Sequence, residues 1–236
     1  MEQATATSDG NCPPDSSGCK LRAAVEVAVA YLLILAVIWT PRPWQRYLWM
    51  VAAAAIITMM WVRFDGWKTM GLRAANFWRS LWIVSAALVL AGAAMPVAAR
   101  MHTLEVPRGP VAFIETYCAY AIWTGVQQFL LQGFFLLRLL RVIPKAWIAA
   151  LAAAILFAAA HLPNPVLTPV TLIWGFAACL LFLRYRDLYP LMMAHAILGI
   201  TVALTVPGPV VHNMRVGLGY LRYNQQRHGH GLQRLP

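Results

Sequence analysis

The stretch Val126-Gln127-Gln128-Phe129-Leu130-Leu131-Gln132-Gly133 places three amides in a segment that is otherwise apolar enough to lie in a lipid bilayer. Two further polar side chains, His161 and His195, occur in later apolar segments. A polar group in hydrocarbon is costly when it finds no partner, so such groups usually face one another or a wet cavity. These five side chains therefore predict either polar contacts that hold helices together or a site with its own chemistry.

The composition places the chain in a membrane. Of its 236 residues, 61% are hydrophobic and only 11% are charged, which excludes a water-soluble domain of this length. The formal net charge is +11, yet the cations lie at the ends of apolar runs and do not form one patch. They indicate membrane orientation and head-group anchoring, not a nucleic-acid partner. The expected partner is the lipid bilayer itself.

Apolar segments of the length that crosses a ~30 Å hydrocarbon core recur along the chain and predict an all-α polytopic transmembrane bundle. We expect seven spans, near residues 23–40, 47–62, 77–99, 111–141, 146–161, 166–183 and 188–206. The fourth is longer than a perpendicular span needs, so it should tilt or extend beyond the membrane. Pro163 and Pro165 should end the fifth, which places His161 at a helix end beside a loop.

The chain divides into four parts by composition. Residues 1–22 form a polar N-terminal tail, 23–110 hold the first three spans, 111–206 form the core with the glutamines and histidines, and 207–236 form a basic C-terminal tail. Within the second part, residues 64–73 mix aromatic and cationic side chains, which is typical of a segment at the lipid head groups. A simple loop is the alternative.

Lys and Arg residues are distributed unequally between the two sides of the expected bundle. Eleven lie on the side of the N-terminus and four on the other, before a tail with another four. The positive-inside rule therefore predicts a cytoplasmic N-terminus, in an inner membrane of the bacterial type. Seven spans would leave the basic tail outside. An eighth, interfacial or re-entrant piece near residues 210–223 would resolve this conflict.

The three glutamines allow two interpretations. On an α-helix Gln127 and Gln128 point about 100° apart, whereas Gln128 and Gln132 share a face. They could simply bridge helices through amide hydrogen bonds, each worth about 0.6–2 kcal/mol. Alternatively, His161 and His195 on separate helices, beside a glutamine-bearing third, form a built site. An imidazole can bind a divalent metal such as zinc, or accept a proton near neutral pH.

The order and spacing of these blocks resemble the CPBP membrane family, also called Abi or type II CAAX proteases. The resemblance covers about residues 111–203 and rests on the Gln127-Gln128 pair, on the block from Phe157 to His161, and on His195 after a short Arg/Asp/Leu/Pro turn. In that family the blocks are usually Glu-Glu-x-x-x-Arg, Phe-x-x-x-His and His-x-x-x-Asn. The resemblance implies an intramembrane endopeptidase in which a Glu and the first His activate water, while the last His and Asn stabilise an oxyanion.

The chain departs from the family pattern where the pattern is charged or donates hydrogen bonds. The replacements are Gln127 and Gln128 for the glutamates, Gln132 for the arginine and Gly199 for the asparagine. Phe157, His161 and His195 are retained. A carboxamide cannot act as a general base at neutral pH, and the loss of both anions removes the reason for a buried cation. The site therefore resembles a neutralised member of the family.

Three hypotheses follow for the function. In the first, a protease-fold protein binds a membrane peptide or a lipid-modified substrate without the usual glutamate-based cleavage. In the second, it is an active endopeptidase with another base; Glu115 is the acid within the fourth span, but it lies about 18 Å along the helix from Gln127. In the third, His161 and His195 hold a zinc ion, although a catalytic zinc generally has three protein ligands.

The site expected from the sequence is shared by these hypotheses. Its polar, candidate catalytic residues are Gln127, Gln128, Gln132, His161 and His195, and its candidate substrate contacts are Phe157 and Gly199. Measured from the cytoplasmic helix ends, His161 lies about 24 Å deep and His195 about 11 Å, so the two meet only if the helices tilt. We also expect Gln127→Glu with Gln128→Glu to restore cleavage only together with Gln132→Arg and Gly199→Asn, because an unpaired buried carboxylate would be protonated.

Overall fold

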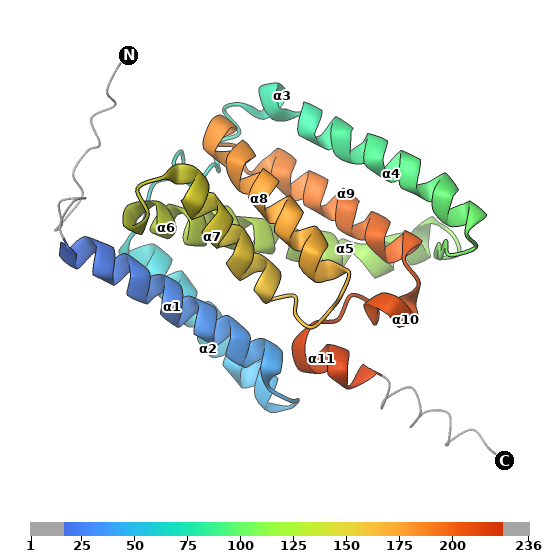
Figure 1. Cartoon of the computed structure of the whole chain (residues 1–236), viewed down its shortest axis with the longest axis horizontal. Helices are drawn as coiled ribbons and strands as arrows, with labels where there is room; N and C mark the ends of the chain where they lie inside the picture. The colour runs from blue at the N-terminus through green and yellow to red at the C-terminus, as the bar shows by residue number, and fades with distance from the viewer. Residues whose placement is uncertain (1–16, 224–236) are drawn as a thin grey trace.

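The chain folds as a bundle of helices (Figure 1). The computed structural model describes residues 17–223, and within that range it contains helices and turns but no strand. The elements are α1 (Ser17–Trp39), α2 (Trp44–Val62), α3 (Phe77–Ser80), α4 (Trp82–Arg100), α5 (Pro110–Gln128), the π-helix η1 (Phe129–Leu136), α6 (Leu137–Val142), α7 (Ala146–Ala159), α8 (Leu167–Tyr185), α9 (Tyr189–Thr205), α10 (Gly208–Val211) and α11 (Gly217–Leu221). The predicted all-α class is confirmed.

Within residues 17–223, four helical segments are long and apolar enough to cross a membrane: α1, α2, α3 with α4, and α8. Two more, α7 and α9, are apolar but have only 14 and 17 residues. The long fourth span is a continuous run from α5 through η1 to α6. The chain is therefore an integral membrane bundle, and each expected span corresponds to a helix or to a run of helices.

The segment near residues 210–223 contains two short helices, α10 and α11, of 4 and 5 residues. Neither is long enough to cross a bilayer, because a spanning helix needs about 20 residues. Residues 64–73 likewise form turns and no helix. They are fastened to the bundle at Met70, which is buried, and at the carbonyl of Gly71, which accepts a hydrogen bond from the backbone N–H of Leu188 at 3.0 Å.

The helices pack side by side around one core. Two of the main pairs are successive helices, α1 with α2 and α7 with α8, and three join helices distant in sequence: α1 with α6, α4 with α9, and α5 with α9. In Figure 1, α1 and α2 flank the bundle on one side and α4 on the other, with α7, α8 and α9 between them. Small residues let α7 and α8 approach closely: four alanines of α7 are fully buried, and a Cβ at Gly175 of α8 would lie 3.5 Å from the Ala154 backbone.

The C-terminal segment is held against the loop that follows α7. Asn164 in this loop is fully buried, and its Nδ2 donates to the carbonyls of Val211 and Arg215 at 2.8 and 3.1 Å. Its Oδ1 accepts from two backbone N–H groups at the start of α8. Gly217, with φ +54°, lies against the end of α1, where a Cβ would come within 2.2 Å of Ile38 Cγ2. Asn164 thus joins the loop after α7, the start of α8 and the C-terminal segment.

We predict that Asn164→Ala lowers the free energy of unfolding by about 2–4 kcal/mol, because it removes four hydrogen bonds to backbone groups, two of them buried and two partly buried. Thermal unfolding of the detergent-solubilised protein measures the effect. Thr116→Val is the matched control, since Thr116 is exposed and bonds only a carbonyl of its own helix. Equal stability of the two variants would contradict the assignment.

Candidate functional site

A cavity of about 400 Å³ lies inside the bundle, between α1, α5, η1, α7, α8, α9 and residues 213–216. Its walls are mainly aliphatic and aromatic. The polar residues predicted from the sequence that line it are Gln127, His161 and His195, together with the expected substrate contacts Phe157 and Gly199. Among its described lining residues there is no Asp or Glu. The cavity is thus a polar centre without a carboxylate.

His161 stands just after the end of α7, as the proline-rich loop predicted. Its Nδ1 lies 2.7 Å from the carbonyl oxygen of Phe157. A carbonyl oxygen can only accept, so Nδ1 carries the proton and donates it. In the neutral ring this leaves Nε2 as an acceptor, available to take a proton or to bind a ligand.

Phe157 brings the two histidines together. Its ring centroid lies 4.8 Å from that of His161 and 5.9 Å from that of His195, both in edge-on arrangements. All three residues line the same cavity. His161 and His195 therefore share one site, although the sequence predicted that they lie at different depths in the membrane.

Gln128 holds His195 in place. The two side chains are buried, and Gln128 Nε2 lies 2.9 Å from His195 Nδ1. With the amide donating, Nδ1 accepts and the ring proton is placed on Nε2. The neighbouring residue Gln127 points elsewhere and lines the cavity directly. The two glutamines therefore diverge, as the angle of about 100° between adjacent helical residues requires.

Gln132 does not join this group. It is fully buried, does not line the cavity, and neither of its amide atoms has a hydrogen-bond partner among the residues that the structure describes. Residues 129–136 form the π-helix η1, which the sequence did not predict. Gln128 and Gln132 are both fully buried, and neither lines the cavity. Glu115 is exposed on α5 and likewise lies outside the cavity.

Tyr120 is a residue of the site that the sequence interpretation missed. A Cβ added to Gly199 would lie 2.0 Å from the Tyr120 hydroxyl oxygen, so this hydroxyl occupies the space beside Gly199. Both residues line the cavity. The available signal was spacing, because Tyr120 precedes Gln127 by seven residues, or about two helical turns. A hydroxyl that can donate a hydrogen bond therefore stands where a side chain at position 199 would project.

The donor set fits a catalytic zinc ion poorly. Within residues 17–223 no three His, Cys, Asp or Glu side chains gather as a potential metal site. Catalytic zinc generally has three protein ligands, whereas the cavity offers the two imidazoles, one of them already bonded through Nδ1 to Gln128. We therefore derive no step through a metal ion.

The fold and the cavity define an intramembrane helical protein with a neutral polar site enclosed by apolar walls. Residues 110–201 match the family model described as "Type II CAAX prenyl endopeptidase Rce1-like". The matched segment runs from α5 into α9 and contains every predicted site residue. It confirms the resemblance to the CPBP, or CAAX protease-like, family. No curated protein and no solved structure matches the chain.

We predict that Gly199→Ala destabilises the protein by about 1–3 kcal/mol, although alanine normally stabilises a helix relative to glycine. The added Cβ would overlap the Tyr120 hydroxyl. In a Tyr120→Ala background the same change should cost much less, because the two residues are in contact. Unfolding midpoints of the parent, both single variants and the double variant measure this coupling, and simple additivity would contradict it.

The same contact changes the design of an experiment that restores the family's charged pattern. Gly199→Asn needs space that Tyr120 occupies, so the four substitutions expected from the sequence also require Tyr120→Ala.

Proposed function

We propose that the cavity binds a membrane peptide or a lipid-modified peptide, and that the protein does not hydrolyse it by a glutamate-based mechanism. The observation that carries this proposal is a cavity with two histidines and Gln127 on its wall but no carboxylate among its described lining residues. Its volume of about 400 Å³ is within the range of about 300–1,000 Å³ typical of small-molecule sites.

The walls suit a ligand with a hydrocarbon part. Aliphatic and aromatic side chains from six helical elements form most of the surface, and burial of a ligand's apolar area there is favourable by about 25 cal/mol per Å². An isoprenoid or a run of apolar side chains would supply such area. The polar residues then fix the orientation of the ligand.

The polar groups suit a peptide bond. Trp174 lines the cavity, and its Nε1–H is buried without a hydrogen-bond partner in the described part of the chain. It can donate to a peptide carbonyl, while His161 Nε2 can accept from a peptide N–H. Gln127 can do either. Binding of this kind needs no ionised group, which agrees with the neutral wall.

The glutamines explain why binding need not lead to cleavage. General-base catalysis requires a group that takes a proton from water in the transition state, and a carboxamide does not do this at neutral pH. Gln128 has a different task, because its amide is bonded to His195. The two positions at which the family carries carboxylates thus orient groups and contact the ligand.

A second candidate function is an endopeptidase with His161 as its base. The bond from His161 Nδ1–H to the Phe157 carbonyl favours it, since the remaining Nε2 could accept a proton from water. The Tyr120 hydroxyl would then be a donor toward a developing oxyanion. Zinc held by His161 and His195 remains a further hypothesis; metal analysis of the purified protein with and without His195→Ala tests it, and equal zinc content would contradict it.

We predict that the purified protein binds a fluorescently labelled farnesyl-cysteine peptide at least about tenfold more tightly than the same peptide without the farnesyl group, because each buried CH₂ contributes roughly 0.8 kcal/mol. Ala160→Trp should remove this preference by filling the cavity, of which Ala160 is a wall. Val89→Trp is the control, since Val89 is exposed on α4. Fluorescence anisotropy measures binding, and an Ala160→Trp protein that binds like the control would overturn the proposal.

We predict no cleavage when the unmodified protein is incubated with a library of prenylated and membrane-spanning peptides and the products are analysed by mass spectrometry. The physical reason is the lack of a carboxylate base in the described cavity wall. His161→Ala is the diagnostic variant. Cleavage by the parent that His161→Ala abolishes would reject binding without hydrolysis and support the endopeptidase.

A further inference from the structure

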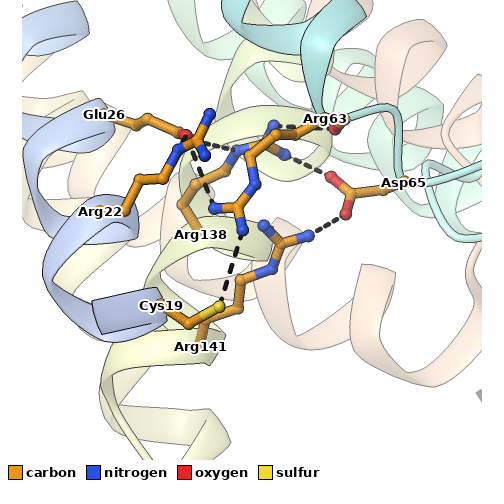
Figure 2. Close-up of polar contacts among 7 residues, drawn as sticks. All are labelled: Cys19, Arg22, Glu26, Arg63, Asp65, Arg138 and Arg141. Atoms are coloured by element: carbon orange, nitrogen blue, oxygen red, sulfur yellow. Dashed lines mark hydrogen bonds and ion pairs between the residues drawn. The ribbon is translucent and has the colours of Figure 1, made fainter. Parts of the chain in front are cut away.

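Figure 2 shows a second polar centre, at which charged side chains from distant parts of the chain meet. It lies toward the other end of α1 from the cavity. The cavity meets α1 at Tyr31, Ile34 and Ile38, whereas this centre begins at Arg22, in the second turn of the helix. We call it the arginine cluster; it consists of Arg22, Glu26, Arg63, Asp65, Arg138 and Arg141. Its residues come from the start of α1, the turn after α2, and α6.

Arg138 forms the inner, structural part of the cluster. Its side chain is 1% exposed, and it contacts Glu26 on one side, at 3.3 Å, and Asp65 on the other. It also donates to the backbone carbonyl of Arg63 at 3.2 Å. This guanidinium therefore joins α1, α6 and the turn after α2, and its donors are used inside the protein.

The outer part carries more positive charge than the protein neutralises. Glu26 also meets Arg22 at 3.3 Å and Arg63 at 3.6 Å, and Asp65 also meets Arg141. The cluster thus has four guanidinium groups and two carboxylates, a surplus of two positive charges. Each guanidinium offers five donors, far more in total than two carboxylates can accept.

The surplus donors are within reach of the surface. The side chains of Arg22 and Arg141 are 57% and 32% exposed, and that of Arg63 is 18% exposed. Arg63 Nη1 is buried yet has no hydrogen-bond partner within residues 17–223, because its 3.6 Å separation from Glu26 is too long for a hydrogen bond. An external anion would satisfy donors that the protein leaves unused.

An apolar groove of about 490 Å³ adjoins the cluster, between α1 and α2. Leu21 and Val25 of α1 and Met59 and Val62 of α2 form its apolar walls, and the ion pair of Arg22 with Glu26 also lines it. The groove lies at the first turns of α1 and the last turns of α2, which is the level of the lipid head groups in a spanning bundle. Positive donors and a hydrocarbon groove are therefore side by side.

We propose that the arginine cluster and this groove bind an anionic phospholipid, with its phosphate at Arg22 and Arg63 and part of an acyl chain between α1 and α2. Guanidinium groups recognise phosphate oxygens through paired, charge-assisted hydrogen bonds. A free phosphate would use the same donors, but only a lipid would also use the groove. The site is separate from the cavity and does not depend on the function proposed for it.

The test uses the full-length protein in a nonionic detergent, titrated with phosphatidylglycerol, phosphatidylcholine or inorganic phosphate and monitored by thermal unfolding and native mass spectrometry. Phosphatidylglycerol should stabilise the protein most. Arg22→Gln and Arg63→Gln should each weaken its binding on the order of fivefold, as expected for one basic residue at a lipid surface. Both variants keep the Arg138–Glu26 pair. Arg46→Gln, at the opposite end of α2, is the control.

The groove is tested without changing any charge. Thr58→Trp should weaken phosphatidylglycerol binding, because Thr58 lines the groove. Ile57→Trp should not weaken it, because the neighbouring residue Ile57 is exposed and does not line the groove. Three results would overturn the proposal: equal stabilisation by phosphatidylcholine, equal stabilisation by inorganic phosphate, or a Thr58→Trp protein that binds phosphatidylglycerol like Ile57→Trp.

Discussion

The hydrogen bond between Gln128 and His195 is the contact on which the arrangement of the cavity depends. Both side chains are buried in a bundle of apolar helices, where neither could remain unpaired without a cost of about 1–3 kcal/mol. By meeting each other they join α5 to α9. The bond also turns the His195 ring so that it lies near Phe157, and through Phe157 near His161. The amide–imidazole pair thus holds the His195 ring on the same side of the cavity as Phe157 and His161, which α7 and the turn after it provide.

Charge is separated along the bundle. The arginine cluster, with its buried Arg138, lies at the first turns of α1, whereas the cavity wall carries no carboxylate among the described residues. A buried ion requires a partner of opposite sign, so a glutamate at position 127 or 128 would need a cation beside it. In the motif resemblance described above, Gln132 takes the place of that cation. Amides at positions 127, 128 and 132 need no partner of opposite charge. Once the two carboxylates are absent, a cation at position 132 would have no partner, so the three replacements are physically consistent with one another.

The sequence predicted the helices well because apolar length and proline positions are local signals. It also predicted that His161 would stand at a helix end, since Pro163 and Pro165 act on the adjacent backbone. The π-helix η1 was not predictable in this way, because its i→i+5 hydrogen bonds leave no mark in the local pattern of apolar residues. Tyr120 was missed because a tyrosine in an apolar helix is ordinary, and only its contact with Gly199 makes it part of the site. Asn164 and Arg138 depend on partners 47 and 112 residues away, so no local pattern reveals them.

The balance of polar atoms narrows the kind of ligand that the cavity suits. A purely hydrocarbon ligand would match the walls but would leave the Trp174 N–H without a partner, since no group in the described chain accepts from it. A buried N–H group without a hydrogen-bond partner costs about 1–3 kcal/mol, which is comparable with the free energy gained by burying one or two methylene groups. A ligand with a carbonyl beside its apolar part removes the penalty and keeps the gain. The ligand proposed above, an apolar or lipid-modified peptide, provides both kinds of group, whereas a lipid tail alone provides one.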